Sequence, residues 1–133
     1  MLEALQTAIV TRFGQNATLA ATSGLFYSEA PKGTTYPYVT FELDVSNEHN
    51  AGAELRNTGL DFIVFSDSAA TLEVNSILDA LRTAFVGTEG SPADPLTVTG
   101  RVNCIRPQEQ GRTLVKNEAG KFRGVMNFNL ILE

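Results

Sequence analysis

Apolar residues recur along this chain with two different periods, and the period separates helical from extended segments. In the first segment every third or fourth residue is apolar, which predicts a helix over residues 2–13 that ends at Gly14. The stripe consists of Leu2, Leu5, Ile9 and Phe13. The stretch up to Ser23 is small and polar, and Leu19 is its expected anchor in the core.

Three strands are predicted next, over residues 24–27, 36–45 and 54–65. The second alternates most clearly, with one face apolar and the other bearing mixed side chains. Pro37 lacks an amide donor and therefore belongs at the start of that strand or on an edge. Both faces of the third strand are partly apolar near its end, so we expect a central strand or one covered by a partner.

A second helix is predicted over residues 72–85, after Ser66-Asp67-Ser68, whose polar side chains are expected to satisfy the free amides of its first turn. Its stripe consists of Leu72, Ile77, Leu78, Leu81 and Phe85. Gly87 is expected to end the helix, and the composition of residues 88–95 predicts a loop.

The remaining sequence predicts a strand over residues 96–105, a polar connection over residues 107–121 and a last strand over residues 122–132. Residues 36–45 and 54–65 are expected to form one hairpin, and the two last strands another. We therefore predict an α+β fold: one domain over residues 1–133, with a mainly antiparallel sheet of four to five strands and two helices packed on one face.

Composition agrees with one ordinary folded domain: 133 residues, 43% of them hydrophobic and 19% charged. The net charge of −5 is unevenly distributed, because residues 1–100 carry 4 basic and 12 acidic side chains while residues 101–133 carry 6 basic and 3 acidic ones. An acidic chain is a poor candidate for gripping a phosphate backbone over its whole surface. The basic final quarter is expected to be a solvated hairpin, with a local binding patch as the alternative.

The sequence contains no recognisable pattern of catalytic residues. One histidine, His49, and one cysteine, Cys104, have no neighbours at metal-ligand spacing, and no serine lies in a nucleophile elbow. Glu42 and Asp44 share a strand face that is expected to be a polar outer surface. No glycine-rich phosphate loop, apolar membrane span or signal peptide is recognisable. We therefore expect no catalytic, metal or cofactor site, and a protein made in the cytoplasm.

Two long polar segments are candidates for binding, because long loops at the ends of paired strands often carry binding residues. They are residues 47–56 and the predicted connection 107–121, the latter with several basic side chains. A flexible hairpin tip is an equally good interpretation of the second. With the outer face of the sheet, these segments give the expected interface residues: Tyr38, Glu48, His49, Glu54, Arg56, Arg112, Lys116, Lys121 and Arg123.

Residues 24–37 (GLFYSEAPKGTTYP), continued by Tyr38-Val39-Thr40-Phe41, resemble the tail-terminator, or tail-completion, proteins of long-tailed bacteriophages. The similarity lies in a short strand, an Ala-Pro-x-Gly loop and a Pro-Tyr-Val strand. A polar loop, a strand ending in an aromatic residue (residues 61–65) and a Ser/Asp-capped helix follow in the family's order. The resemblance covers nearly the whole chain and is strongest over residues 24–85.

The resemblance implies a structural virion protein at the neck, assembled in the host cytoplasm. Family members form a ring, usually of six subunits, on the last ring of the tail tube protein and present a surface to the head connector. DNA passes through the lumen without sequence-specific binding, and related proteins occur in gene transfer agents. A ring needs two different patches on each subunit, and Tyr38, Ile63 and Phe65 on the outer sheet face offer one. The acidic balance suits a channel that passes DNA without gripping it.

Two other functions remain open at this stage. The chain could be another head–tail connector protein of similar size, which would bind the portal side. It could instead be a small cytoplasmic enzyme or ligand-binding domain, which would require a pocket with convergent polar groups and perturbed side chains.

Overall fold

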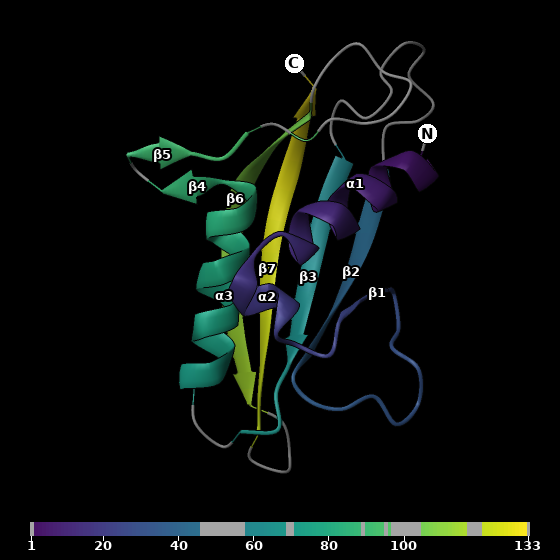
Figure 1. The fold of residues 1–133 in the computed structure, drawn as a ribbon, viewed down its shortest axis with the longest axis vertical. Helices are drawn as coiled ribbons and strands as arrows, with labels where there is room; N and C mark the ends of the chain where they lie inside the picture. Colours follow the sequence, from purple (N-terminus) through teal and green to yellow (C-terminus); the bar gives the residue numbers. More distant parts are fainter. Residues whose placement is uncertain are drawn as a thin grey trace.

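A five-stranded sheet forms one layer of the molecule, and the helices of the described residues lie together against one of its faces (Figure 1). The computed structural model describes residues 2–45, 58–68, 71–88, 90–94, 96, 105–116 and 121–132. The predicted α+β class is confirmed, and a small two-stranded ribbon stands beside the main sheet.

The strand order in the main sheet is β1-β2-β3-β7-β6. The strands are β1 Leu25–Tyr27, β2 Tyr38–Val45, β3 Thr58–Phe65, β6 Ile105–Lys116 and β7 Phe122–Leu132. The short β1 runs parallel to β2, and every other neighbouring pair is antiparallel. The sheet is therefore mixed but mainly antiparallel. β3 lies at its centre, which confirms the prediction made from its two apolar faces.

Three helices cover the sheet within the described residues: α1 Leu2–Gly14, α2 Ala17–Ala20 and α3 Leu72–Phe85. The single turn α2 is not predicted by periodicity, since four residues are too short to show a period. The side chain of Asn16 caps it by accepting a hydrogen bond of 3.1 Å from the amide of Leu19. Leu19 is fully buried and is the anchor that the sequence predicts. None of these helices has the length and apolarity needed to cross a bilayer.

The hydrophobic core fills the space between the helices and the sheet. Phe62 of the central strand contacts the rings of Phe85 in α3 and Phe128 in β7, with ring centroids 5.1 and 5.8 Å away. The largest fully buried side chains are Phe41, Phe62, Phe85, Phe128, Leu5, Ile9, Leu19, Leu60, Leu78, Leu81 and Leu96. One sheet face is thus fully used in holding the domain together.

The second helix departs from the prediction at its start. Leu72 is 79% exposed, so it does not belong to the buried stripe, which instead includes Val74 and Ala80. The N-cap residue is Thr71, and its side chain makes no capping bond. Ser66 accepts a hydrogen bond from the amide of Ser68 rather than from the first helical turn. Polar composition alone therefore located the start of the helix but not its cap.

The largest error concerns residues 107–121, which were predicted to be a polar connection. Residues 105–116 form β6, which pairs with β7 along its length, with an irregularity between Glu109 and Gly111. The predicted hairpin of residues 96–105 with 122–132 is therefore wrong. In the predicted strand itself, Leu96 lies in an isolated bridge and residues 97–104 lie outside the described residues. The composition misled because an edge strand tolerates polar side chains, a proline and a bulge.

Residues 88–95 were predicted to be a loop but contain a small hairpin. Its strands are β4 Gly87–Thr88 and β5 Ser91–Pro92, which project beside α3 (Figure 1). Gly87 has φ +94°, and a Cβ there would lie 2.2 Å from the amide nitrogen of Ala93. Only glycine fits this position, so the predicted helix stop at Gly87 is also the start of the hairpin. The polar segment of residues 47–56, which includes the start of the predicted strand 54–65, lies outside the described residues.

Gly124 sets how closely α3 approaches the sheet. A Cβ at this position would lie 2.6 Å from Cγ1 of Val74 and 2.9 Å from Cδ1 of Leu78. We expect Gly124→Ala to lower the free energy of unfolding by about 1–3 kcal/mol, because α3 must shift to admit a methyl group.

The measurement is the urea unfolding midpoint. Gly14→Ala is the matched control, because a Cβ at Gly14 meets nothing within 4 Å. This control should change stability by less than about 1 kcal/mol. An unchanged midpoint for Gly124→Ala would show that α3 does not rest directly on β7.

Candidate functional site

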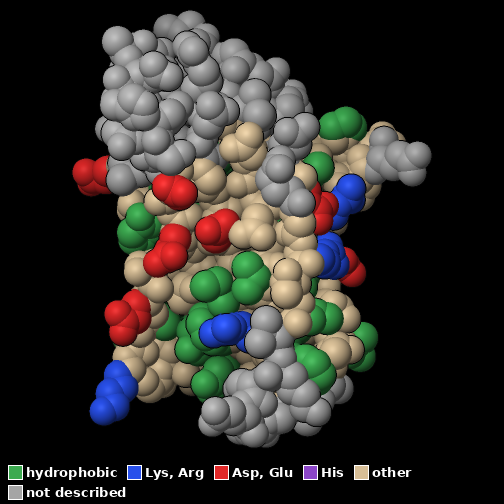
Figure 2. Space-filling model, turned by 180° about the vertical axis from the view of Figure 1, so that it is seen from behind, with side chains coloured by type: hydrophobic (Ala, Val, Ile, Leu, Met, Phe, Trp, Pro, Cys, Tyr) green, Lys and Arg blue, Asp and Glu red, His purple; other side chains and the backbone are tan. Residues whose placement is uncertain are grey.

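The sheet face opposite the helices is not covered by any described segment, and its two halves differ in chemistry. Figure 2 shows this face from behind: hydrophobic side chains gather over its lower half around a basic one, and acidic side chains lie above them. The register of the strands gives five members of the apolar half, and the ring of Tyr36, 5.3 Å from that of Tyr38, adds the sixth. We name it the open-face patch: Phe26, Tyr36, Tyr38, Ile63, Phe65 and Val125.

Aromatic rings stack across the strands of this patch. Tyr38 and Phe65 are cross-strand partners with ring centroids 4.9 Å apart, tilted by 20°. Tyr36 lies 5.3 Å from Tyr38 on its other side, and Phe26 meets Tyr38 edge-on at 6.4 Å. Thr40 is only 3% exposed beneath these side chains. The patch is a packed surface, although Tyr36 remains 47% exposed.

The ionisation of Tyr38 reflects its surroundings. Desolvation by the neighbouring side chains raises the pKa of the Tyr38 phenol above its usual value of 10.0, and the nearby phenol of Tyr36 adds to the shift by charge and hydrogen bonding. These causes favour the neutral form of the Tyr38 phenol over the phenolate.

A guanidinium lies at this patch. Arg123 is the cross-strand partner of Phe65, its side chain is exposed, and it makes no ion pair with the described residues. Tyrosine and arginine are the residues most enriched at the energetic centres of protein interfaces. This half of the face therefore combines residue types that are common at protein interfaces.

The other half of the face is acidic. Glu42 and Asp61 stand directly opposite each other on β2 and β3, with Asp44 two residues further along. Like charges in opposite positions destabilise a sheet, and here only neutral donors offset them within the described residues. Asn127 donates to Asp61 over 2.6 Å, and Ser28 donates to Glu42 over 3.2 Å.

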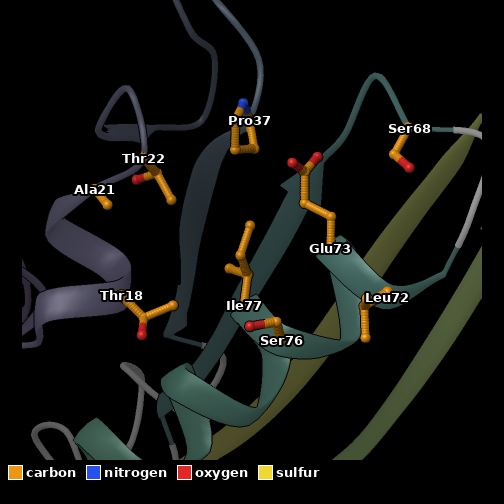
Figure 3. Close-up of a pocket in the computed structure, with 9 residues that line it drawn as sticks. All are labelled: Thr18, Ala21, Thr22, Pro37, Ser68, Leu72, Glu73, Ser76 and Ile77. Atoms are coloured by element: carbon orange, nitrogen blue, oxygen red, sulfur yellow. The ribbon is translucent and has the colours of Figure 1, made fainter.

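The helix side carries a groove between α2 and the start of α3 (Figure 3). It has a volume of about 480 Å³ and is wide open to solvent. Its lining residues are Thr18, Ala21, Thr22, Pro37, Ser68, Leu72, Glu73, Ser76 and Ile77. Its one carboxylate, that of Glu73, accepts a 2.5 Å hydrogen bond from Ser66. A single carboxylate held by a neighbouring hydroxyl does not form an acid–base pair, so the groove gives no support to an enzyme.

Two predicted interface residues are engaged within the subunit. Arg112 lies on the helix side of β6, where it pairs with Asp79 of α3 at 2.8 Å and approaches Glu109 at 3.9 Å. Lys121 donates to Asp67, and this hydrogen bond and the charge of Asp67 raise the pKa of the Lys121 ammonium. Neither contact tests the predicted interface role of these residues, which stays a prediction.

The remaining predicted site residues fall into two groups. Tyr38 and Arg123 lie together on the open face. Lys116 is the last residue of β6, but its side chain lies outside the described part. Glu48, His49, Glu54 and Arg56 also lie outside the described residues. No group of three or more metal-binding side chains occurs in the part of the chain that the structure describes.

Sequence reasoning identified Tyr38, Ile63 and Phe65 as members of the outer face but missed Phe26 and Tyr36. A strand of three residues is too short to show which side chain faces outward. Only the parallel pairing of Phe26 with Thr40 places its ring beside Tyr38. Tyr36 stands two residues before Tyr38 in the predicted strand 36–45, so alternation could have placed it on the same face, although β2 itself begins only at Tyr38.

Comparison with known proteins gave a family match and a structural match. Residues 7–133 match the profile of the family described as "Tail completion protein gp17". The fold is similar to that of a chain in the structure "Virion of native gene transfer agent (GTA) particle", with a TM-score of 0.71 and 20% sequence identity. The alignment covers 99% of this chain and 96% of that one. A search of curated proteins gave no match.

The raised pKa of Tyr38 predicts how stability depends on pH. Because the folded-state pKa lies above the unfolded one, the stabilising contribution is fully present below pH 10.0 and is lost as the pH rises through the raised value. Tyr38→Phe keeps the ring but has no proton to lose. We therefore expect its stability to fall less than that of the wild type above pH 10.0.

The test is the urea midpoint as a function of pH. Tyr27→Phe is the matched control, because it removes a hydroxyl from a ring that is 42% exposed and lies outside the open-face patch. Coinciding profiles for Tyr38→Phe and the wild type would contradict the assignment of the effect to Tyr38.

Proposed function

We propose, from the membership of this chain in the tail completion protein gp17 family, that it closes the end of a tail tube as a hexameric ring and provides the surface to which the head connector joins. Membership makes the chain a structural protein of a bacteriophage-type tail. The ring, its position at the neck and its two partners, the tube protein and the connector, are the proposal.

The observation that supports this function most directly is the open-face patch. A five-stranded sheet that is covered on one side leaves a second face, and on this face aromatic rings lie beside an arginine without an ion pair in the described residues. Contiguous apolar patches on soluble proteins commonly mark interaction sites. A subunit that functions inside a protein assembly has such a surface by necessity.

The charge of the chain supports the passage of DNA through the ring. The net charge of −5 disfavours retention of a polyanion, so DNA can move past the ring without being held. The corresponding prediction is a lumen whose side chains are mainly acidic or neutral. A mainly basic lumen would contradict it.

Deletion of the reading frame from its parent particle tests the function. We expect negative-stain electron microscopy of the lysate to show overlong tail tubes beside full, tailless heads, because an uncapped tube continues to grow and cannot join a head. Supplying the wild-type protein from a plasmid should restore tails of normal length.

Tails of normal length after deletion would contradict the proposal. Heads without tails, together with free tails of normal length, would favour a connector protein that acts only in joining. Intact and infectious particles would remove the structural function at the neck altogether.

A further inference from the structure

We propose that neighbouring copies of this chain contact each other through two specific surfaces, the open-face patch of one copy and the free edge of β1 on the next. This inference rests on the proposed ring, because it names the two patches that the ring requires. The contact places Glu29 of one copy against Arg123 of its neighbour, with Tyr27 against the aromatic rings around Arg123.

The open-face patch calls for a partner that brings a carboxylate. Arg123 lies beside Phe65, and Val125 lies two residues further along the same strand. Because these apolar side chains exclude water when a partner docks, a carboxylate there interacts with the guanidinium more strongly than at an open surface. Within the described residues no acidic side chain of the same subunit meets this need.

The partner is a protein rather than a nucleic acid. Arginine among aromatic rings could also bind single-stranded DNA. However, Asp61 lies four residues from Phe65 on the same strand and on the same face, at a distance of about 13 Å by the rise of a strand. Asp61, Glu42 and Asp44 would repel a phosphate backbone that extended along the strands.

The edge of β1 has the matching chemistry. β1 pairs only with β2 among the described strands, so its other side offers backbone groups to a neighbour. Tyr27 at its end is 42% exposed, and Glu29 is an exposed carboxylate without an ion pair in the described part of the chain.

The turn between these two residues is fixed. Ser28 has φ +66°, which is uncommon for a residue other than glycine. Its amide donates to the carbonyl of Phe41 at 2.8 Å, and its hydroxyl donates to Glu42. The amide of Glu29 in turn donates to the carbonyl of Tyr27 at 2.7 Å. A strained turn held by these three hydrogen bonds presents Glu29 in a defined position, as an interface requires.

The two surfaces point in different directions. The open-face patch lies on the face turned away from the helices, whereas β1 forms the lateral edge of the sheet (Figure 1). A copy that uses its β1 edge against one neighbour therefore keeps its open-face patch for another. This is a heterologous contact, in which two different surfaces meet. When the ring closes, both surfaces of every copy are occupied.

The charges allow a reciprocal exchange experiment. Plasmids supply Arg123→Glu, Glu29→Arg or the double variant to particles whose own reading frame is deleted, and the yield of infectious particles is measured. We expect each single variant to lower the yield about ten-fold or more, because it brings like charges together in the contact. The double variant restores opposite charges and should recover most of the yield.

A control variant separates the contact from a general effect of charge. Glu3→Arg in α1 reverses an exposed charge on the helix side of the molecule and should leave the yield within about two-fold of the wild type. Circular dichroism and urea midpoints of the purified variants verify that they fold.

Several results would overturn the inference. They are wild-type yields for both single variants, a double variant as defective as the single ones, and a defect in Arg123→Glu without one in Glu29→Arg. Retardation of single-stranded DNA by the purified protein that disappears in Arg123→Glu would assign the patch to nucleic acid instead. The deletion strain could form overlong tails while every variant restores the wild-type yield. That result would agree with the proposed ring function and contradict only this contact.

Discussion

The structure depends on one constraint: the helices of the described residues cover a single face of the sheet. The apolar sides of β2, β3 and β7 are buried under α1, α2 and α3, and burial of that surface is the main source of stability. The second face receives no such layer from the described residues. This asymmetry leaves the open-face patch exposed, and this is the surface for which we propose a contact with another protein.

Close packing and exposed charges make unequal contributions to this architecture. Gly124 allows α3 to approach β7 to van der Waals contact, which fixes the core. On the edge strand β6, Glu109 pairs with Arg82 of α3 at 2.7 Å. Arg112 of the same strand lies between Asp79 of α3 and the carboxylate of Glu109. Exposed ion pairs of this kind contribute less than about 1 kcal/mol each, so they align β6 with α3 rather than hold the fold together. The result is a firm support for the open-face patch.

The sequence predicted those parts of the fold in which one physical signal dominates. Alternation gave β2, and apolarity on both faces identified β3 as central. Composition failed as a guide where strand pairing overrides it. Residues 105–116 are polar and contain Pro107 and Gly111. They nevertheless form a strand, because β7 supplies the hydrogen bonds. The site shows the same division. Tyr38 was predicted from its strand, whereas Phe26 joined the patch only through a parallel pairing that no local pattern reveals.

In the assembled particle the open sheet face should be covered by protein. A cryo-electron microscopy reconstruction of the end of the tail tube, at a resolution that shows side chains, can establish whether it is. We expect density of a neighbouring subunit over Tyr38 and Phe65, with an acidic side chain against Arg123. A particle in which this face is turned to solvent, with subunits joined only through their helices, would contradict it.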